Sequence, residues 1–520
     1  MKHRGKVTIL ILGLLITAAF PGSIGEEEGR MPNFVIIMCD DMGYGDWSRG
    51  GSPTIHTPNL NRMADEGVQM TQFYAGGPVC SPCRSALLTG RNSIRTGVIN
   101  VFFPDSEMGM SPGEITIAEA LKPMGYVTAC IGKWHLGDRY AYRPLRQGFD
   151  YFYGLLYSND MLNPNLYMND ELIEQPAVQS TLTKRYTQEA ISFMESSKDQ
   201  PFFLYLPHTM PHVPLAASEE FLGISKRGLY GDVIEEIDWS TGQILDALDR
   251  LGLGEDTLVI FTSDNGPWTI KKQDGGSAGL LRGAKGDTWE GGMREPFIAR
   301  WKGRLPAGVV CTEVGSVIDL FPTCVKLAGG AIPTDRPIDG TDLMPALEGK
   351  EFPERTIFYY GYNHLTTVRK GKWKLHFAYY DHSKGGYAKI TNWVIPDTPL
   401  LFDLEADPSE RFDLSKEHPE VVDELTQTAE RYKEEISSNA ENQDLIDWFI
   451  YEQPFSLLVG MLEPTLVSSV GPLAPAIVAI FEIAINLIGA VAPVLVNLIE
   501  KATPVEGVLR WLVEKIPNNP

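Results

Sequence analysis

Four apolar, β-rich runs that each end in polar residues limit the fold of this chain more than any other feature of its sequence. The runs are residues 33–39, 126–131, 201–207 and 257–263. They alternate with segments in which apolar residues recur at helical spacing, such as residues 230–251. Strands that alternate with helices form a sheet whose strands are mostly parallel. We therefore expect an α/β fold in which helices sandwich a large, mixed and mostly parallel sheet.

The polar residues after these runs form the candidate active site. They are Asp40 and Asp41, then Lys133 and His135, then His208 and His212, and last Asp264 and Asn265. The carboxyl ends of parallel strands meet at one edge of such a sheet, where ligands bind. One polar loop needs no functional explanation, but four of them favour a single site. His208 is left out, because a lone histidine is more often a packing residue.

The types of these residues favour a divalent cation and an oxyanion. Asp40, Asp41, Asp264 and Asn265 are oxygen donors without the Cys/His spacing of zinc sites, and such donors suit Ca²⁺ or Mg²⁺. Clustered carboxylates also need a cation to offset their repulsion. The basic residues Arg84, Lys133 and Lys285 would complete a receptor for sulfate or phosphate.

Cys80 begins the segment CSPCRSALLTGR, near the first turn of a predicted helix. Free N–H groups at a helix start favour an anion, so Cys80 is placed to attack a bound sulfate or phosphate. One histidine can then serve as base and another as acid. A plain thiol, however, would be left carrying the transferred group.

The same segment resembles the signature of the sulfatase family. CSPCR and SALLTGR match its Cys-x-Pro-x-Arg and Thr-Gly-Arg motifs, and GKWHLG, SDNG and RGAKGDTWEGGMREP resemble further motifs in order. The resemblance covers residues 31–440. FLGISKRGLYGDVIEEID and SERFDLS are most similar to the arylsulfatase A and N-acetylgalactosamine-6-sulfatase branch, which has the alkaline-phosphatase-like fold.

This resemblance implies that a maturing enzyme reads Pro82 and Arg84 and oxidises Cys80 to Cα-formylglycine. One hydroxyl of the hydrated aldehyde attacks sulfur, and the alcohol leaves. The other hydroxyl then collapses to the aldehyde and expels sulfate. The implied reaction is hydrolysis of a sulfate ester of a sugar, a glycosaminoglycan or an aryl alcohol.

The resemblance also implies a role for each site residue. One Ca²⁺ ion would bind residue 80 together with Asp40, Asp41, Asp264 and Asn265. Arg84 and Lys133 would orient the diol, and His135 would take the proton during sulfate expulsion. His212 and Lys285 would contact the sulfate and protonate the leaving oxygen, and Lys133 and Ser158 are further substrate contacts.

Two other functions stay open at this point. A formylglycine-dependent phosphoester or phosphonate hydrolase can share this sheet and the same modified cysteine. A catalytically inert protein that binds sulfated glycans is the other alternative, although every motif residue is present.

Changes in composition divide the 520 residues into four parts. Residues 1–25 have a basic start and an apolar run, typical of a signal peptide, with an uncleaved anchor as the alternative. Residues 26–350 are expected to form the catalytic α/β domain. Residues 351–445 predict a smaller C-terminal subdomain with an antiparallel sheet and a covering helix near residues 419–437.

The apolar tail, residues 446–520, has no assigned role. It contains two uncharged runs broken by prolines and by Glu482. Helices packed on the protein or on a second subunit, contact with a membrane and disorder are the three alternatives, so a homo-oligomer stays open.

The formal charge of −22 argues against nucleic acid as a partner. The chain contains no Asn-x-Ser/Thr acceptor for N-glycosylation. Secretion or a periplasmic location is therefore favoured, with the lysosome as the alternative. Cys39 and Cys130 are expected to be buried thiols, and Cys311 and Cys324 are candidates for pairing.

Overall fold

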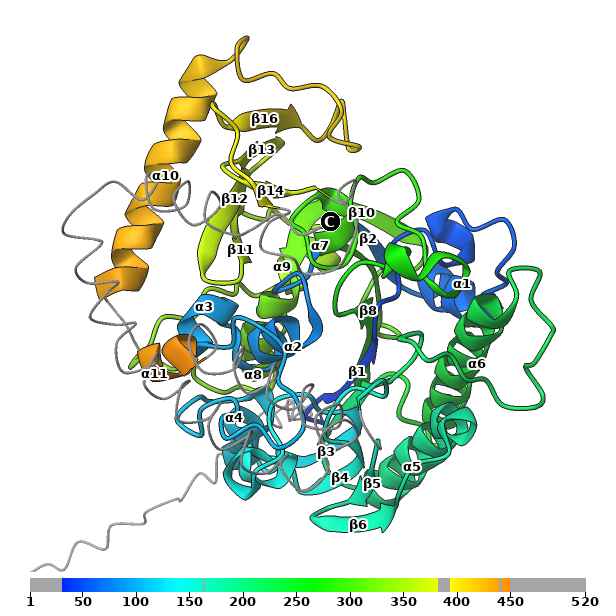
Figure 1. The fold of residues 1–520 in the computed structure, drawn as a ribbon. Helices are drawn as coiled ribbons and strands as arrows, with labels where there is room; N and C mark the ends of the chain where they lie inside the picture. The colour runs from blue at the N-terminus through cyan, green and yellow to red at the C-terminus, as the bar shows by residue number, and fades with distance from the viewer. Residues whose placement is uncertain (1–29, 162–163, 382–392, 439–441, 449–520) are drawn as a thin grey trace, which may run out of the picture.

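A sheet of ten strands runs through the centre of the molecule (Figure 1). The computed structural model describes residues 30–161, 164–381, 393–438 and 442–448. Across the sheet the strands are β10 (Val309–Ser316), β2 (Val68–Tyr74), β9 (Arg294–Arg300), β8 (Thr257–Ser263), β1 (Asn33–Cys39), β7 (Phe202–Pro207), β3 (Val127–Lys133), β4 (Tyr151–Leu155), β5 (Leu166–Met168) and β6 (Glu171–Glu174).

The five central strands, β8, β1, β7, β3 and β4, are parallel to one another. Strand β9 is antiparallel to both β2 and β8, and β5 and β6 continue the other side as antiparallel strands. The sheet is thus mixed and mostly parallel, as expected. The four predicted runs coincide with β1, β3, β7 and β8 to within two residues at each end.

Alternate residues of β1 pack into two separate cores. Phe34, Ile36 and Met38 face one core, whereas Val35 and Ile37 face the other. Both faces of the strand are buried, which explains its unbroken apolar run. Helices cover both faces of the sheet, so the predicted sandwich is confirmed.

The helices divide between these two cores (Figure 1). On the face of Val35 lie α1 (Pro58–Asp65), α5 (Leu182–Ser197) and α6 (Leu229–Arg250). On the face of Phe34 lie α2 (Cys80–Thr89), α3 (Ser93–Thr96), α4 (Ile117–Leu121), α8 (Leu320–Leu327), α9 (Met344–Leu347), α11 (Gln443–Asp447) and the short α7 (Glu290–Met293). None of the helices among the described residues is both long and apolar enough to span a bilayer.

A second, antiparallel sheet follows in the chain. It consists of β11 (Thr356–Gly361), β12 (His364–Lys370), β13 (Trp373–His376) and β16 (Leu400–Asp403). Helix α10 (Pro419–Ser438) packs on it through Leu425, which shares a small core with Val368, Leu375 and Leu401. Beside this sheet, β14 (Tyr379–Tyr380) pairs with β15 (Trp393–Val394).

Other predictions have mixed outcomes. Cys39 and Cys130 are buried thiols as expected, but Cys311 and Cys324 are both free, so they do not pair. The side chain of Cys311 instead approaches the Ala346 carbonyl. The predicted signal peptide, and the apolar tail beyond residue 448, lie outside the described residues. The predicted domain boundaries stay predictions.

Candidate active site

Side chains from three strand ends and one helix start meet at a single buried site. Strand β1 is followed by Asp40 and Asp41, β8 is followed by Asp264 and Asn265, β3 ends in Lys133, and α2 begins at Cys80. These six side chains are all buried. They meet because the carboxyl ends of neighbouring parallel strands share one edge of the sheet.

Two consecutive carboxylates reach the site because the chain leaves the extended conformation at Asp41. Successive side chains of a strand point to opposite faces. Asp41 instead has a φ of 69°, in the left-handed region that residues other than glycine seldom adopt. Its backbone N–H donates to Asp264 Oδ1 at 3.2 Å, which supports this conformation. Asp40 and Asp41 therefore join one cluster.

The Cys80 thiol lies between one carboxylate and two ammonium groups. It donates a hydrogen bond to Asp40 Oδ1 at 3.2 Å. Lys133 Nζ lies 3.4 Å from its Sγ, and Lys285 Nζ lies 3.6 Å from it. Burial, followed by the charge of Asp40, raises the pKa of the thiol well above its usual value. The unmodified thiol is thus protonated and a poor nucleophile.

Three carboxylates pair with three basic side chains in this site. Arg84 Nη2 donates to Asp264 Oδ2 at 2.7 Å, Lys285 Nζ lies 2.6 Å from Asp41 Oδ1, and Lys133 Nζ donates to Asp40. Burial alone would raise the pKa of Asp40, but the charge of Lys133 and its other basic neighbours holds it well below the usual range.

The pKa of Asp41 responds differently. Burial raises it to about 7, because the opposing charge of Lys285 does not offset burial and the nearby charges of Asp40 and Asp264. The ionised form of Asp41 is therefore disfavoured at this site, and a further positive charge would stabilise it.

The donor atoms fit a cation that prefers oxygen ligands. Ligand atoms of Asp40, Asp41, Cys80 and His212 lie within 4.8 Å of one another. Asn265 Nδ2 donates to Asp41 Oδ1 at 2.7 Å, while its Oδ1 is buried and has no hydrogen-bond partner among the described residues. A cation would satisfy this oxygen and stabilise the ionised form of Asp41. Carboxylate and amide oxygens are ligands of Ca²⁺ and Mg²⁺.

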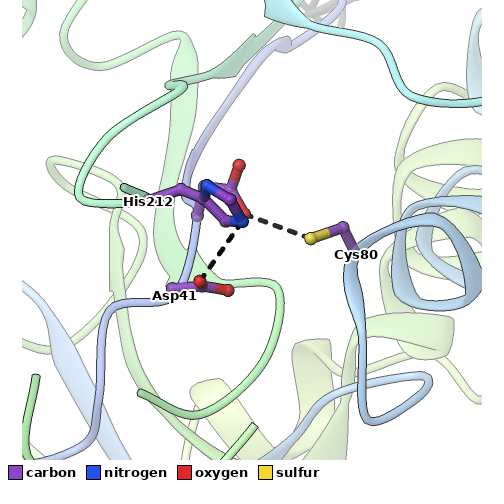
Figure 2. A group of neighbouring side chains, drawn as sticks. Asp41, Cys80 and His212 are labelled. Carbon is purple, nitrogen blue, oxygen red and sulfur yellow. Dashed lines mark hydrogen bonds and ion pairs between the residues drawn. The ribbon is translucent and has the colours of Figure 1, made fainter. Parts of the chain in front are cut away.

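His212 points between Asp41 and Cys80 (Figure 2). Its Nδ1 lies 2.6 Å from the Val213 carbonyl oxygen and therefore carries a proton. Its Nε2 faces Asp41 Oδ2 at 3.6 Å. Burial, followed by the charge of Lys285, lowers the pKa of His212 well below its usual value. The neutral ring thus presents an unprotonated Nε2 to the site.

His135 is a buried, neutral imidazole in which one ring nitrogen has no hydrogen-bond partner among the described residues. Its Nε2 lies 3.0 Å from the Phe102 carbonyl oxygen and donates to it, whereas Nδ1 has no partner among the described residues. Burial, followed by the charge of Lys133, lowers its pKa well below the usual value. Its backbone φ of 61° lies in the left-handed region. Nδ1 is therefore an available proton acceptor.

Of the other residues considered from the sequence, Ser158 lies beside the cluster around Cys80, whereas His208 contacts Ser240. Ser158 belongs to the site, because its Oγ accepts a hydrogen bond from Lys133 Nζ at 3.1 Å. His208 is buried 3.4 Å from Ser240 Oγ, and burial lowers its pKa to about 4. Sequence reasoning missed Trp268, whose ring lies 5.1 Å from the His212 ring and 4.6 Å from Lys285 Nζ. Its position directly after SDNGP was the available signal.

A buried ionic network braces the loop that carries Lys285. Glu290, at the start of α7, accepts hydrogen bonds from Tyr74 at 2.7 Å and from Lys374 of β13 at 2.8 Å. Lys374 also lies 3.1 Å from Glu410, which bonds to His376 at 2.7 Å. The second sheet therefore holds one wall of the active site through charged groups that are fully buried.

Family models match both parts of the chain. The sulfatase model matches residues 32–331, and the model of the C-terminal region of aryl-sulfatase matches residues 352–454. The chain belongs to the sulfatase family. This sulfatase is 38% identical to mouse N-acetylgalactosamine-6-sulfatase over 486 residues, which cover 84% of this chain and 93% of the relative. The dog N-acetylgalactosamine-6-sulfatase is 41% identical, over 79% of this chain and 87% of that protein.

Solved structures agree with this assignment. The PsFucS1 sulfatase from Pseudoalteromonas sp. superposes with a TM-score of 0.72 at 27% identity, covering 79% of this sulfatase and 91% of that chain. The phosphonate monoester hydrolase of Agrobacterium radiobacter has a TM-score of 0.53 at 18% identity, covering 78% and 96%, and supports the shared alkaline-phosphatase-like fold alone. The protein is thus an enzyme of the sulfatase class, as the motifs predicted.

Proposed function

We propose that this sulfatase hydrolyses the 6-sulfate ester of N-acetylgalactosamine in a glycan, with residue 80 as Cα-formylglycine and one bound Ca²⁺. The convergence of two ammonium groups and a carboxylate on Cys80 carries the proposal. The names of the mouse and dog relatives support the choice of sugar. The high pKa of the thiol supports the modification, because an unmodified Cys80 lacks nucleophilic character at neutral pH.

Asp40, Asp41, Asp264, Asn265 and residue 80 would hold the calcium ion. When bound, the ion supplies positive charge that keeps the carboxylates ionised and polarises an oxygen of the sulfate group. The unpartnered Asn265 Oδ1 and the raised pKa of Asp41 support its presence.

Lys133 and Lys285, whose ammonium groups both lie close to residue 80, bind the sulfate oxygens. Both ammonium groups are buried, and each is anchored by a carboxylate. Charges held in a site that excludes water stabilise a developing anion more than charges in solvent do. Ser158 positions Lys133 through the hydrogen bond to its Nζ.

The two histidines divide the proton transfers. His135 accepts a proton at Nδ1 when sulfate leaves, because its Nε2 proton is already donated to the Phe102 carbonyl. His212 faces the leaving oxygen with Nε2 and protonates it from the imidazolium form. The negative charge of a bound sulfate ester raises the pKa of His212 and favours that form.

Two measurements test this proposal. The mass of the peptide that contains residue 80, from protein made with its maturing enzyme, should be that of the aldehyde. The enzyme should hydrolyse N-acetylgalactosamine 6-sulfate far faster than the 4-sulfate isomer, which is the matched control. An unmodified thiol in every molecule would refute the formylglycine mechanism, and equal turnover of the two isomers would refute the positional choice.

Hydrolysis of phosphate or phosphonate esters is the competing reaction. Comparison of 4-nitrophenyl sulfate with 4-nitrophenyl phosphate separates the two, and the proposal requires a preference for sulfate. We further propose that residues 1–25 export the enzyme to a secreted or periplasmic location. Fractionation of the native host, with a variant that lacks these residues as control, tests the location.

A further inference from the structure

A cavity of about 300 Å³ lies directly beside the active-site wall. It is lined by Thr269, Arg282, Gly283, Ala284, Trp289, Tyr379, Tyr380 and Asp381. Two of these residues are chain neighbours of site residues, because Ala284 precedes Lys285 and Thr269 follows Trp268. Consecutive Cα atoms lie about 3.8 Å apart, so the cavity shares the loop that carries Lys285 with the Cys80 site.

Two separate segments of the chain form the walls of this cavity. One wall is the loop between β8 and α7, and the other is β14, which lies beside α7 (Figure 1). The Trp289 and Tyr379 rings meet between these walls with their centroids 5.4 Å apart. Aromatic rings together with a carboxylate, a hydroxyl and a guanidinium are the groups that bind a sugar ring and its substituents. The cavity is therefore suited to a sugar unit.

Arg282 gives the cavity a fixed positive charge. Its guanidinium carbon lies 3.7 Å from the centre of the Trp289 ring, and its Nη1 donates to the Glu410 carbonyl oxygen at 2.9 Å. Among the described residues that carbonyl is its one hydrogen-bond acceptor. Arg282 is exposed, so its other donors remain available to a ligand. A guanidinium held in this way binds a carboxylate or a sulfate with little loss of entropy.

The position of this charge is informative because the chain as a whole carries −22. A net negative charge disfavours the approach of an anionic glycan, so basic residues must attract it locally. Lys271 stacks on Trp268 with its Nζ 4.2 Å from the ring centre, next to Thr269 of the cavity. The basic groups thus extend from the Cys80 site to this cavity.

We propose that this cavity binds the sugar unit next to the sulfated one, and that Arg282 selects a unit that carries a carboxylate or a second sulfate. The inference rests on the proposed function, since it assumes a glycan substrate. Arg282 would then determine substrate specificity and take no part in the bond cleavage at residue 80.

The test compares two disaccharides that differ in one group. Both contain N-acetylgalactosamine 6-sulfate, linked either to glucuronic acid or to glucose, its counterpart without the carboxylate. The parent enzyme should favour the acidic disaccharide in kcat/KM by about tenfold, the expected effect of one charge-assisted hydrogen bond. In Arg282→Ala this ratio should fall to about one, whereas Arg282→Lys should retain part of it.

Arg304→Ala is the matched control, because Arg304 is an exposed arginine that stacks on Trp301 with 4.3 Å between guanidinium carbon and ring centre. It should leave the ratio unchanged. A general defect in Arg282→Ala would lower both rates by one factor and preserve the ratio. A ratio near one in the parent enzyme, or an unchanged ratio in Arg282→Ala, would overturn the inference.

Binding separates this inference from the proposed function. Calorimetric titration of Cys80→Ala with each disaccharide measures affinity without turnover, and the acidic disaccharide should bind about tenfold more tightly. The added change Arg282→Ala should remove this difference. If the parent enzyme cleaves neither sugar sulfate while the binding difference persists, the proposed function fails and the subsite stands. Equal affinities would refute the subsite even in an active enzyme.

Discussion

Cys80 is the residue on which the active site converges, because Lys133, Lys285 and Asp40 all contact its side chain. Replacement of Cys80 by alanine should lower turnover of a sulfate ester by at least about 10³-fold, as loss of a nucleophile does in other hydrolases. Cys80 is one small buried side chain, so thermal unfolding should change little.

Cys83 provides the matched control for that substitution. It lies one helical turn further on, is equally buried, and accepts a hydrogen bond from the Gly76 N–H at 3.4 Å. Cys83→Ala should retain most of its turnover. Activity of Cys80→Ala near that of the parent would contradict the mechanism.

Asp264 connects the predicted ion to the basic side chains. Asp264→Asn keeps the shape of the side chain but removes one negative charge from the ligand set, so Ca²⁺ affinity should fall about 10- to 100-fold. Titration of calcium into chelator-treated protein measures this change. Asp246→Asn is the control, since Asp246 pairs with Arg62 at the surface. Unchanged affinity in Asp264→Asn would remove Asp264 from the ligand set.

At the scale of elements, the contact between α7 and β13 determines how firmly the Lys285 loop is held. Glu290→Gln breaks a fully buried ion pair, so the free energy of unfolding at pH 7 should fall by about 3–5 kcal/mol. Glu424→Gln is the control, because Glu424 pairs with Lys370 at the surface and such pairs contribute about 0–1 kcal/mol. Denaturant unfolding measures both values.

The same contact predicts an acid sensitivity. Burial would raise the pKa of Glu290, but Lys374, followed by Arg294 and Arg369, outweighs it and lowers the pKa to about 2 from an ordinary 4.5. A lowered pKa in the folded state gives stability that is present above the unfolded value and is lost as the pH falls. The difference in unfolding free energy between parent and Glu290→Gln should therefore shrink by about 3 kcal/mol from pH 6 to pH 2. A constant difference would contradict this assignment.

The strands could be predicted from the sequence, whereas the long-range contacts between elements could not. The strands that carry Asp40, Lys133 and Asp264 were predictable, because a strand buried on both faces reads as an unbroken apolar run. The left-handed backbone at Asp41 was not, since it depends on a contact with Asp264 more than two hundred residues away. The network of Glu290, Lys374 and Glu410 was hidden for the same reason. Long-range pairing of charged residues leaves no local pattern.

For the whole molecule, all six cysteines are free and buried, so reductant should not change the melting temperature. Thiol titration of the denatured enzyme should give six groups per chain before maturation and one fewer after complete conversion of residue 80. The count thus measures the matured fraction independently of activity. Before maturation, a count two or more below six without reductant, restored to six by reductant, would reveal a disulfide and contradict the free state of these thiols.

The cavity wall formed by β14 affects how the substrate specificity of such an enzyme can change during evolution. The groups around residue 80 are anchored to the ends of central strands, whereas the neighbouring cavity is built from a loop and a two-stranded hairpin. Insertions or exchanges in these peripheral segments can therefore alter which polymer is accepted without disturbing the bond-breaking centre. Such changes would fall at residues 269, 282–284 and 379–381, while the carboxylates that follow β1 and β8 stay as they are.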